Sequence, residues 1–261
     1  MEVESYEHGV PSWVDHSSPD PTRAREFYGG LFGWNVEEGP PEAGGYSMAT
    51  RNGRNVAGIG PQPMPGPAAW GTYVNVDSAD DVAARVEANG GRVLMTPMDV
   101  FDAGRLAVFV DPAGAVFGVW QPGTHKGAGL VNEEGTFGWA ELVTPDQEGA
   151  KAFYTAVFGW EPSIMPDENR PPGGYTVWSV GDRRVGGMMG KPEGEPAEVP
   201  AYWNVYFIVA DTDKAVAKAQ ELGGRLAFGP FDSPAGGRIA VIADPAGARF
   251  SVISGAAAGP E

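Results

Sequence analysis

The sequence predicts an α+β fold built from two tandem copies of one domain, and three observations carry this prediction. The segment 26–34 (EFYGGLFGW) returns 126 positions later (152 − 26) as 152–160 (AFYTAVFGW). The turn sequence Asp-Pro-Ala-Gly occurs at 111–114 and again at 244–247. Each half alternates short apolar runs with two amphipathic segments, which is typical of sheets covered by few helices.

The repeat divides the chain into domain 1 at residues 9–121, a linker at 122–134 and domain 2 at 135–255. A chain of 261 residues is long enough for two domains that each bury a core. No apolar run approaches the roughly 20 residues that cross a bilayer, so we expect no membrane partner. The chain has no cysteine, which excludes disulfides and thiolate ligands and favours a reducing cytoplasm.

The net charge of −16 excludes one further class of partner. An acidic surface repels phosphate backbones, so we expect no nucleic-acid binding. The charge favours cationic ligands at low salt, but its simpler role is solubility.

Each domain is expected to begin with a short strand, at 12–16 or 138–142, followed by a helix. Asp20 and Asp146 have the side chain that caps a helix N-terminus, and Gly33 and Gly159 end the helices. Apolar residues recur at helical spacing: Ala24, Phe27, Tyr28 and Leu31, then Ala150, Phe153, Tyr154 and Val157. Two strand-like runs follow in each half, at 46–50 and 56–60, then at 175–180 and 185–189.

The second module of each half follows a proline-rich loop, at 61–67 or 192–200, which cannot pair inside a sheet. A strand and a helix then return, at 71–76 and 80–89, and at 204–209 and 213–222. A hairpin around the Asp-Pro-Ala-Gly turn closes each domain, with strands at 106–110 and 115–120, and at 239–243 and 248–253. The segments 96–104 and 229–237 are interpreted as ordinary hairpin connections rather than lids.

This order of motifs resembles the vicinal oxygen chelate superfamily, which includes glyoxalase I, extradiol dioxygenases and bleomycin-resistance proteins. The resemblance covers nearly all of residues 9–255, and a narrower one is to two-domain actinobacterial glyoxalase-like proteins of the "hydroxylase" type. It implies tandem duplicated vicinal-oxygen-chelate domains, in which four βαβββ modules form two half-open barrels. It also implies a metal held by His, Glu or Gln on the inner wall of a barrel.

The positions that match those metal ligands carry other residues in this chain: Trp13, Gly71, Gly118, Trp139, Asn204 and Ser251. The sequence therefore predicts no metal and no other cofactor. His8 and His125 are interpreted as solvated residues of the N-terminal segment and the linker. His16 is interpreted as a core histidine, because strand alternation places it with Val14 on the helix-covered face.

The same alternation predicts which side chains face the barrel interiors. If Trp13 faces inward, so does Asp15, and in domain 2 Trp139 and Glu141 do the same. The later strands and the closing strands add Tyr73, Asn75, Trp120, Asn204 and Tyr206. We expect the four aromatic residues Trp13, Trp139, Tyr73 and Tyr206 to line or stack against a ligand, while Trp34 and Trp160 belong to the core. For Trp70 and Trp203 the sequence leaves rim and core equally open.

Asp15 and Glu141 have two interpretations. A carboxylate beside indole rings is partly desolvated and holds its proton tightly, as a general acid or base does. The alternative, slightly favoured, is a buried carboxylate that accepts hydrogen bonds from a neighbouring strand or tyrosine.

The sequence therefore predicts metal-independent binding of a small aromatic molecule or secondary metabolite, including sequestration as bleomycin-resistance proteins imply. The alternatives are a metal-free isomerase, cyclase or lyase that uses Asp15 or Glu141, and a metal-dependent glyoxalase or dioxygenase with non-standard ligands. The halves differ at Trp120 against Ile253 and at Gly71 against Asn204, which leaves open whether one cavity or both function. Two domains in one chain are compatible with a monomer or a homodimer.

Overall fold

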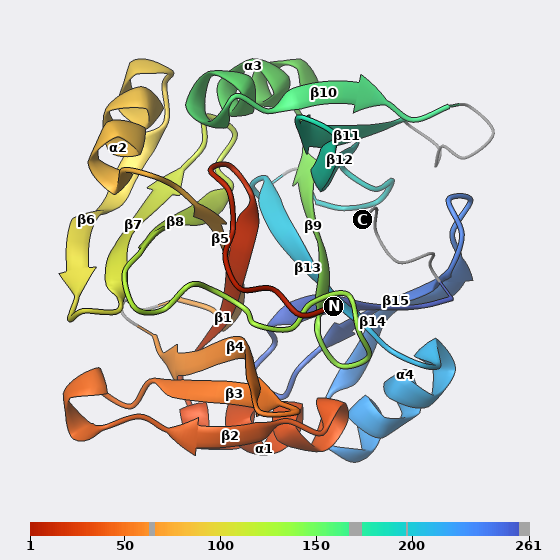
Figure 1. Cartoon of the computed structure of the whole chain (residues 1–261). Helices are drawn as coiled ribbons and strands as arrows, with labels where there is room; N and C mark the ends of the chain where they lie inside the picture. The colour runs from red at the N-terminus through yellow and green to blue at the C-terminus, as the bar shows by residue number, and fades with distance from the viewer. Residues whose placement is uncertain (63–65, 167–173, 197, 256–261) are drawn as a thin grey trace.

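A computed structural model describes residues 1–62, 66–166, 174–196 and 198–255. Each half of the chain forms one eight-stranded sheet, and domain 1 lies at the left and domain 2 at the right of Figure 1. The elements of domain 1 are β1 (Pro11–Ser18), α1 (Pro21–Phe32), β2 (Asn35–Glu38), the short 3-10 helix η1 (Pro41–Ala43), β3 (Ser47–Arg51), β4 (Arg54–Pro61), β5 (Ala69–Asn75), α2 (Ala79–Ala88), β6 (Arg92–Val100), β7 (Gly104–Val110) and β8 (Val116–Pro122).

Domain 2 repeats this order. Its elements are β9 (Phe137–Thr144), α3 (Gln147–Phe158), β10 (Glu161–Ile164), β11 (Tyr175–Val180), β12 (Arg183–Gly190), β13 (Tyr202–Ile208), α4 (Thr212–Glu221), β14 (Arg225–Asp232), β15 (Arg238–Ala243) and β16 (Arg249–Ser254). None of the helices in the described part of the chain has the length and apolar character of a membrane span.

The two sheets have the same topology. The strand order is β2-β3-β4-β1-β5-β8-β7-β6 in domain 1 and β10-β11-β12-β9-β13-β16-β15-β14 in domain 2. In each sheet the first strands of the two modules pair antiparallel at the centre, and each also pairs parallel with the last strand of its own module. The end strands are unpaired with each other, so each sheet is a half-open barrel. The predicted α+β fold with four repeated modules is confirmed.

The prediction of loops at 96–104 and 229–237 is wrong for residues 96–100 and 229–232, which lie in strands. The edge strand β6 continues to Val100, and the edge strand β14 continues to Asp232. Each contains a proline, Pro97 or Pro230, and in each the pairing register shifts across that proline. A bulge at a sheet edge accommodates a residue that has no N–H to donate, so the strand continues past it. The proline-rich loops predicted at 61–67 and 192–200 lie partly outside the described residues.

The predicted helix ends are confirmed. The Asp20 carboxylate accepts a hydrogen bond from the Arg23 amide at 3.0 Å, and Asp146 accepts one from the Gly149 amide at 2.9 Å. Gly33 and Gly159 end α1 and α3 in the left-handed conformation, with φ of 69° and 74°, which a glycine adopts without steric cost.

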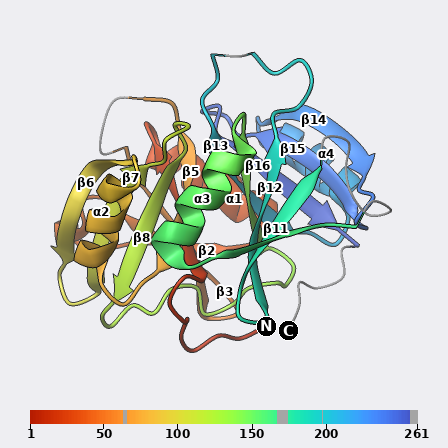
Figure 2. The same cartoon turned by 90° about the horizontal axis from the view of Figure 1, so that it is seen from above.

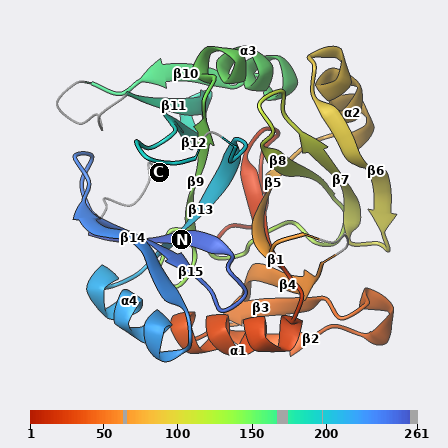
Figure 3. The ribbon, with the colours of Figure 1, turned by 180° about the vertical axis from the view of Figure 1, so that it is seen from behind.

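The hydrophobic cores are shared between the domains. One core combines α1, β1 and β4 of domain 1 with β13, β15, β16 and α4 of domain 2, and the other combines the second module of domain 1 with the first module of domain 2. Accordingly α1 lies beside α4, and α2 beside α3 (Figures 1 and 3). Figure 2 looks down on the α2–α3 side of the molecule. Trp34 and Trp160 belong to these cores as predicted, and Trp70 and Trp203 are also largely buried within or against them.

The turn aspartates connect the two domains. Asp244 accepts hydrogen bonds from the Ala246 and Ala248 amides of its own turn and, at 3.1 Å, from the Tyr28 hydroxyl of domain 1. Asp111 repeats this with the Tyr154 hydroxyl of domain 2, also at 3.1 Å. The repeated Phe-Tyr and Asp-Pro-Ala-Gly motifs therefore contact each other across the domain interface.

One difference breaks this symmetry. His16 is fully buried, and its Nε2 lies 2.8 Å from Oδ2 of Asp244, whereas the equivalent strand position in domain 2 is Leu142. Burial raises the pKa of Asp244, but the His16 imidazole, together with hydrogen bonds from the Ala248 amide and the Tyr28 hydroxyl, brings the pKa below its ordinary value. Without such a partner, burial raises the pKa of Asp111. The prediction that His16 is a core histidine on the helix-covered face is confirmed by its contacts with Tyr28 and Trp70.

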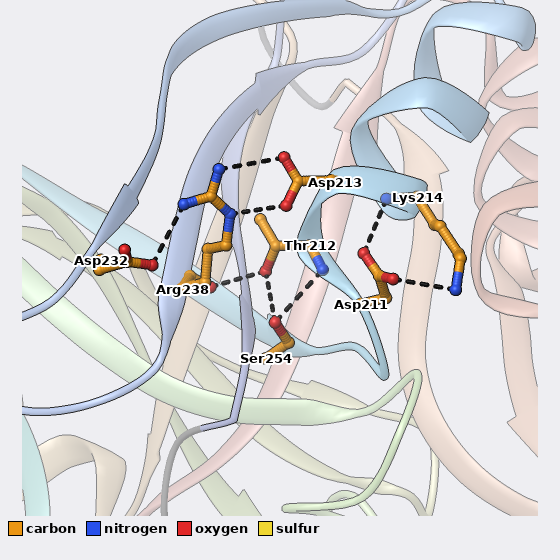
Figure 4. Close-up of polar contacts among 7 residues, drawn as sticks. All are labelled: Asp211, Thr212, Asp213, Lys214, Asp232, Arg238 and Ser254. Atoms are coloured by element: carbon orange, nitrogen blue, oxygen red, sulfur yellow. Dashed lines mark hydrogen bonds and ion pairs between the residues drawn. The ribbon is translucent and has the colours of Figure 1, made fainter.

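An arginine holds the β14–β15 hairpin of domain 2 in place. In domain 2, Arg238 at the start of β15 contacts both carboxylate oxygens of Asp213 on α4 and one oxygen of Asp232 on β14 (Figure 4). The hydroxyl of Thr212 donates to the Arg238 carbonyl at 2.6 Å and lies 3.0 Å from the Ser254 hydroxyl. These contacts tie the turn end of the β14–β15 hairpin to α4 and to the last strand.

Candidate functional site

Domain 2 contains a cavity of about 280 Å³ on the concave side of its sheet. This volume is near the lower end of the roughly 300–1,000 Å³ of small-molecule sites. Aromatic and aliphatic side chains dominate its wall, and the turn of the β14–β15 hairpin borders it. The lining residues are Gly138, Trp139, Glu141, Met165, Tyr175, Val177, Arg184, Met189, Tyr206, Ile208, Phe231, Ser233, Pro234, Ala235, Gly236, Ile239 and Ile253.

A buried carboxylate lies at the polar side of this cavity. Glu141 on β9 accepts a hydrogen bond from the Tyr206 hydroxyl at 2.8 Å. The indole N–H of Trp139 donates to the Tyr175 hydroxyl at 2.9 Å. Burial raises the pKa of Glu141 above its ordinary value, and hydrogen bonds from Tyr206 and Tyr175 offset part of that rise.

The position of the Tyr175 hydroxyl depends on a glycine. Gly187 on β12 pairs with Glu141 in the sheet register. A Cβ atom at Gly187 would lie 1.9 Å from the Tyr175 hydroxyl, which no side chain tolerates. The glycine therefore gives the hydroxyl the space it needs beside Glu141.

Asn204 and Ser251 contact each other instead of the cavity. The Asn204 amide donates to the Ser251 hydroxyl at 2.8 Å, and both side chains are buried. Of the residues predicted for a site in domain 2, the structure brings Trp139, Tyr206 and Glu141 together at the cavity wall, whereas Asn204 is not among the lining residues.

Domain 1 repeats the polar cluster. The Trp13 indole donates to the Tyr46 hydroxyl at 2.9 Å, and this hydroxyl lies 3.4 Å from Oδ2 of Asp15. Gly58 takes the place of Gly187, since a Cβ there would lie 1.8 Å from the Tyr46 hydroxyl. Burial raises the pKa of Asp15 to about 7, against smaller opposing effects of hydrogen bonds from Tyr73 and Tyr46.

In domain 1, two rings lie beside this cluster: Trp120 from the last strand and His125 from the linker. The His125 ring meets the Trp13 indole edge-on at 4.5 Å, and it lies 5.6 Å from the Trp120 ring. The Trp120 indole donates to the His125 carbonyl at 2.9 Å. The equivalent of Trp120 in domain 2 is Ile253, which lines the cavity. Trp13 and Trp120 thus contact His125.

The prediction that His125 is a solvated linker residue is wrong. The linker returns along domain 1, where the Ala128 amide donates to the Ser12 carbonyl at 2.8 Å and the Tyr6 hydroxyl donates to the Ala128 carbonyl. This path carries the His125 side chain inward, and burial lowers its pKa. The Asn75 side chain holds the N-terminal segment by donating to the Tyr6 and Glu7 carbonyls, so its donors serve the fold. The predicted role of Asn75 in binding a ligand stays a prediction.

The residues do not suit the metal that the resemblance implies. In the described parts of the chain, no three His, Asp or Glu side chains are grouped as metal ligands would be. Glu141 is held by tyrosine hydroxyls, and Asn204 and Ser251 bond to each other. The imidazole of His16 contacts Asp244 on the opposite, helix-covered face. Within residues 1–62, 66–166, 174–196 and 198–255, a transition metal that prefers imidazole and free carboxylate finds no group of three such donors.

Several site residues were missed from the sequence. Tyr46 and Tyr175 lie at the starts of equivalent strands, and each faces a glycine, so comparison of the two halves contained the signal. Arg184 and the turn 233–236 gave no such signal, because the equivalent positions in domain 1 differ.

The raised pKa of Asp15 predicts a pH-dependent stability. An acid whose pKa rises from 3.8 to about 7 on folding binds its proton more tightly in the folded state, so this stabilisation is present below pH 4 and is lost as the pH rises to 7. The effect is on the order of 4 kcal/mol at most. Asp15→Asn should flatten the pH dependence of the free energy of unfolding between pH 4 and 7, measured by urea denaturation. An unchanged slope would contradict the assignment, and Asp99→Asn, an exposed aspartate, is the control.

Comparisons with known proteins agree with this architecture. The model of the Glyoxalase/Bleomycin resistance protein/Dioxygenase superfamily matches residues 12–119 and again residues 136–252. Among curated proteins, the chain is 45% identical over 255 residues to the glyoxylase-named protein CFP32 of Mycobacterium tuberculosis, covering 95% of both chains. It is 41% identical over 263 residues to the anthracycline biosynthesis protein DnrV of Streptomyces peucetius, covering 94% of this chain and 93% of DnrV.

Solved structures share the fold at lower identity. The 2,3-dioxygenase LapB from Pseudomonas sp. KL28 superposes with a TM-score of 0.67 at 15% identity, over 98% of this chain and 96% of LapB. The Mn(II)-bound glyoxalase from Novosphingobium aromaticivorans gives 0.63 at 17% identity, over 95% of this chain and 83% of that enzyme.

Proposed function

Because the chain belongs to the Glyoxalase/Bleomycin resistance protein/Dioxygenase superfamily, we propose that it binds a planar aromatic small molecule in domain 2 without a metal. The observation that carries the proposal is the difference between the two barrels. In domain 2 a cavity of about 280 Å³ adjoins Trp139, Tyr175 and Tyr206, whereas in domain 1 the His125 and Trp120 rings lie beside the equivalent cluster.

The wall chemistry supports an aromatic ligand. Trp139 and Phe231 offer ring surfaces, and the remaining wall is largely aliphatic, so a flat apolar molecule gains from both stacking and burial. The relative DnrV is named for anthracycline biosynthesis. A polycyclic aromatic ligand of that chemical kind, a hydroxyanthraquinone, is therefore the first probe to test.

Tryptophan fluorescence tests this proposal. Titration with 1,8-dihydroxyanthraquinone should quench the emission saturably, and the same Kd should be measured in the presence of EDTA. Trp139→Ala should raise Kd at least about tenfold, since lost stacking and burial together exceed about 1.4 kcal/mol. Trp13→Ala, the matched change in domain 1, should leave Kd unchanged. Absence of saturable quenching across a panel of quinones and flavonoids would overturn the proposal, and loss of binding with EDTA would overturn metal independence.

Glu141 supports a second candidate, proton transfer to or from the bound ligand. Its raised pKa and its place at the cavity wall suit a general acid. If the protein is an isomerase, cyclase or lyase, Glu141→Gln should abolish turnover of the ligand, followed by chromatography, while Kd stays within about threefold. Full activity of that variant would exclude the role, and Asp15→Asn is the matched control in domain 1.

A further inference from the structure

A second, smaller hollow adjoins the aromatic cavity of domain 2. It has a volume of about 60 Å³ and lies between the start of β12, β9 and the N-terminal segment. Gly138, Trp139 and Arg184 line both spaces. The two spaces therefore border each other at these three residues. The volume exceeds the roughly 10–15 Å³ that one water needs, so it suits a small substituent and not another ring.

Two arginines give this hollow a positive character. Arg183 and Arg184 both line it, and no Asp or Glu does. Among the residues that the structure describes, neither guanidinium has a carboxylate partner. By contrast, Arg54, Arg105 and Arg238 are each paired with carboxylates.

The equivalent positions of domain 1 provide a comparison for these two arginines. Arg183 opens β12 as Arg54 opens β4, but Arg54 contacts Glu2 at 2.6 Å and Glu4 at 3.3 Å. The next position is Arg184 in domain 2 and Asn55 in domain 1. Domain 2 thus has one more guanidinium than domain 1 at this place, and within the described residues neither Arg183 nor Arg184 is paired with a carboxylate.

We propose that the ligand of domain 2 is an anionic aromatic, a carboxylate or a compact equivalent, whose charged group occupies the hollow against Arg183 and Arg184. This inference rests on the proposed binding of an aromatic ligand and names its class. A guanidinium matches the geometry of a carboxylate with two parallel N–H donors. The Trp139 ring then covers the apolar body, and the arginines set its orientation.

A pair of probes that differ only in charge tests the class. Anthraquinone-2-carboxylic acid and anthraquinone-2-carboxamide should both bind, and the acid should bind at least tenfold more tightly to the wild-type protein by calorimetry. Arg184→Gln and Arg183→Gln should each reduce this preference, and the double variant should abolish it while the amide keeps its Kd. Arg225→Gln, at an exposed arginine of β14 outside both linings, is the control that should keep the preference.

The outcomes separate the two proposals. Equal binding of acid and amide by the wild-type protein, or an acid preference that survives the double variant, would overturn the anionic class and leave aromatic binding intact. Absence of binding by either probe and by uncharged quinones would overturn both.

Discussion

Asp244→Ala is expected to lower the free energy of unfolding by about 3–5 kcal/mol, since each buried donor left without its acceptor costs about 1–3 kcal/mol. The substitution leaves the Tyr28 hydroxyl and two turn amides without their acceptor inside a core shared by both domains, and it removes the carboxylate that the His16 ring contacts. For a chain of this size the melting temperature should fall by roughly 6–20 °C. Calorimetry or circular dichroism measures the change.

Asp111→Ala is the matched control for this prediction, because Asp111 accepts the equivalent hydrogen bonds, while the position that corresponds to His16 is Leu142. It should be destabilising to a smaller extent. His16→Leu, which copies the domain 2 residue, should cost less than Asp244→Ala because it leaves Asp244 in the environment that Asp111 already has. A larger loss from Asp111→Ala than from Asp244→Ala would show that the His16 contact contributes nothing.

Ile253→Trp is expected to abolish ligand binding in domain 2, with Kd raised at least about a hundredfold, or 2.7 kcal/mol. The change places in the cavity wall the residue that domain 1 has at the same position, Trp120. An indole there takes up volume that the ligand needs, since Ile253 and Trp139 line the same space. Titration with the quinone probe measures the loss.

Thermal unfolding shows whether the Ile253→Trp protein is folded, and Ile253→Phe provides a milder step with an intermediate loss of affinity. Val116→Trp, on a half-exposed strand of domain 1, is the control for adding an indole. Unchanged affinity in folded Ile253→Trp protein would place the ligand elsewhere.

The sequence was sufficient for the fold because the signals were local and repeated. Asp20 and Asp146 cap helices through contacts three residues away, and Gly33 and Gly159 end them by backbone freedom alone. Strand alternation likewise placed Trp139 and Glu141 on one face. Such features depend only on nearby residues in the chain. Because the same pattern occurs in both halves, each copy supports the prediction made from the other.

The features that were missed depend on distant parts of the chain. The contact of Tyr28 with Asp244 spans 216 residues, and nothing near either residue indicates its partner. His125 lies in a linker whose composition suggests exposure, but the linker's hydrogen bonds to domain 1 carry the ring inward. The strands β6 and β14 continue past prolines through bulges that only the pairing reveals.

The division of each hydrophobic core between the two halves has a consequence for synthesis. When the first 122 residues leave the ribosome, α1 and α2 have apolar faces whose partners, α4 and α3, are not yet made. The nascent N-terminal half therefore acquires its final packing only after translation has passed residue 250. A fragment that ends in the linker lacks those partners permanently. Because the two domains are repeats, a second copy of the fragment has helices that resemble the missing α3 and α4.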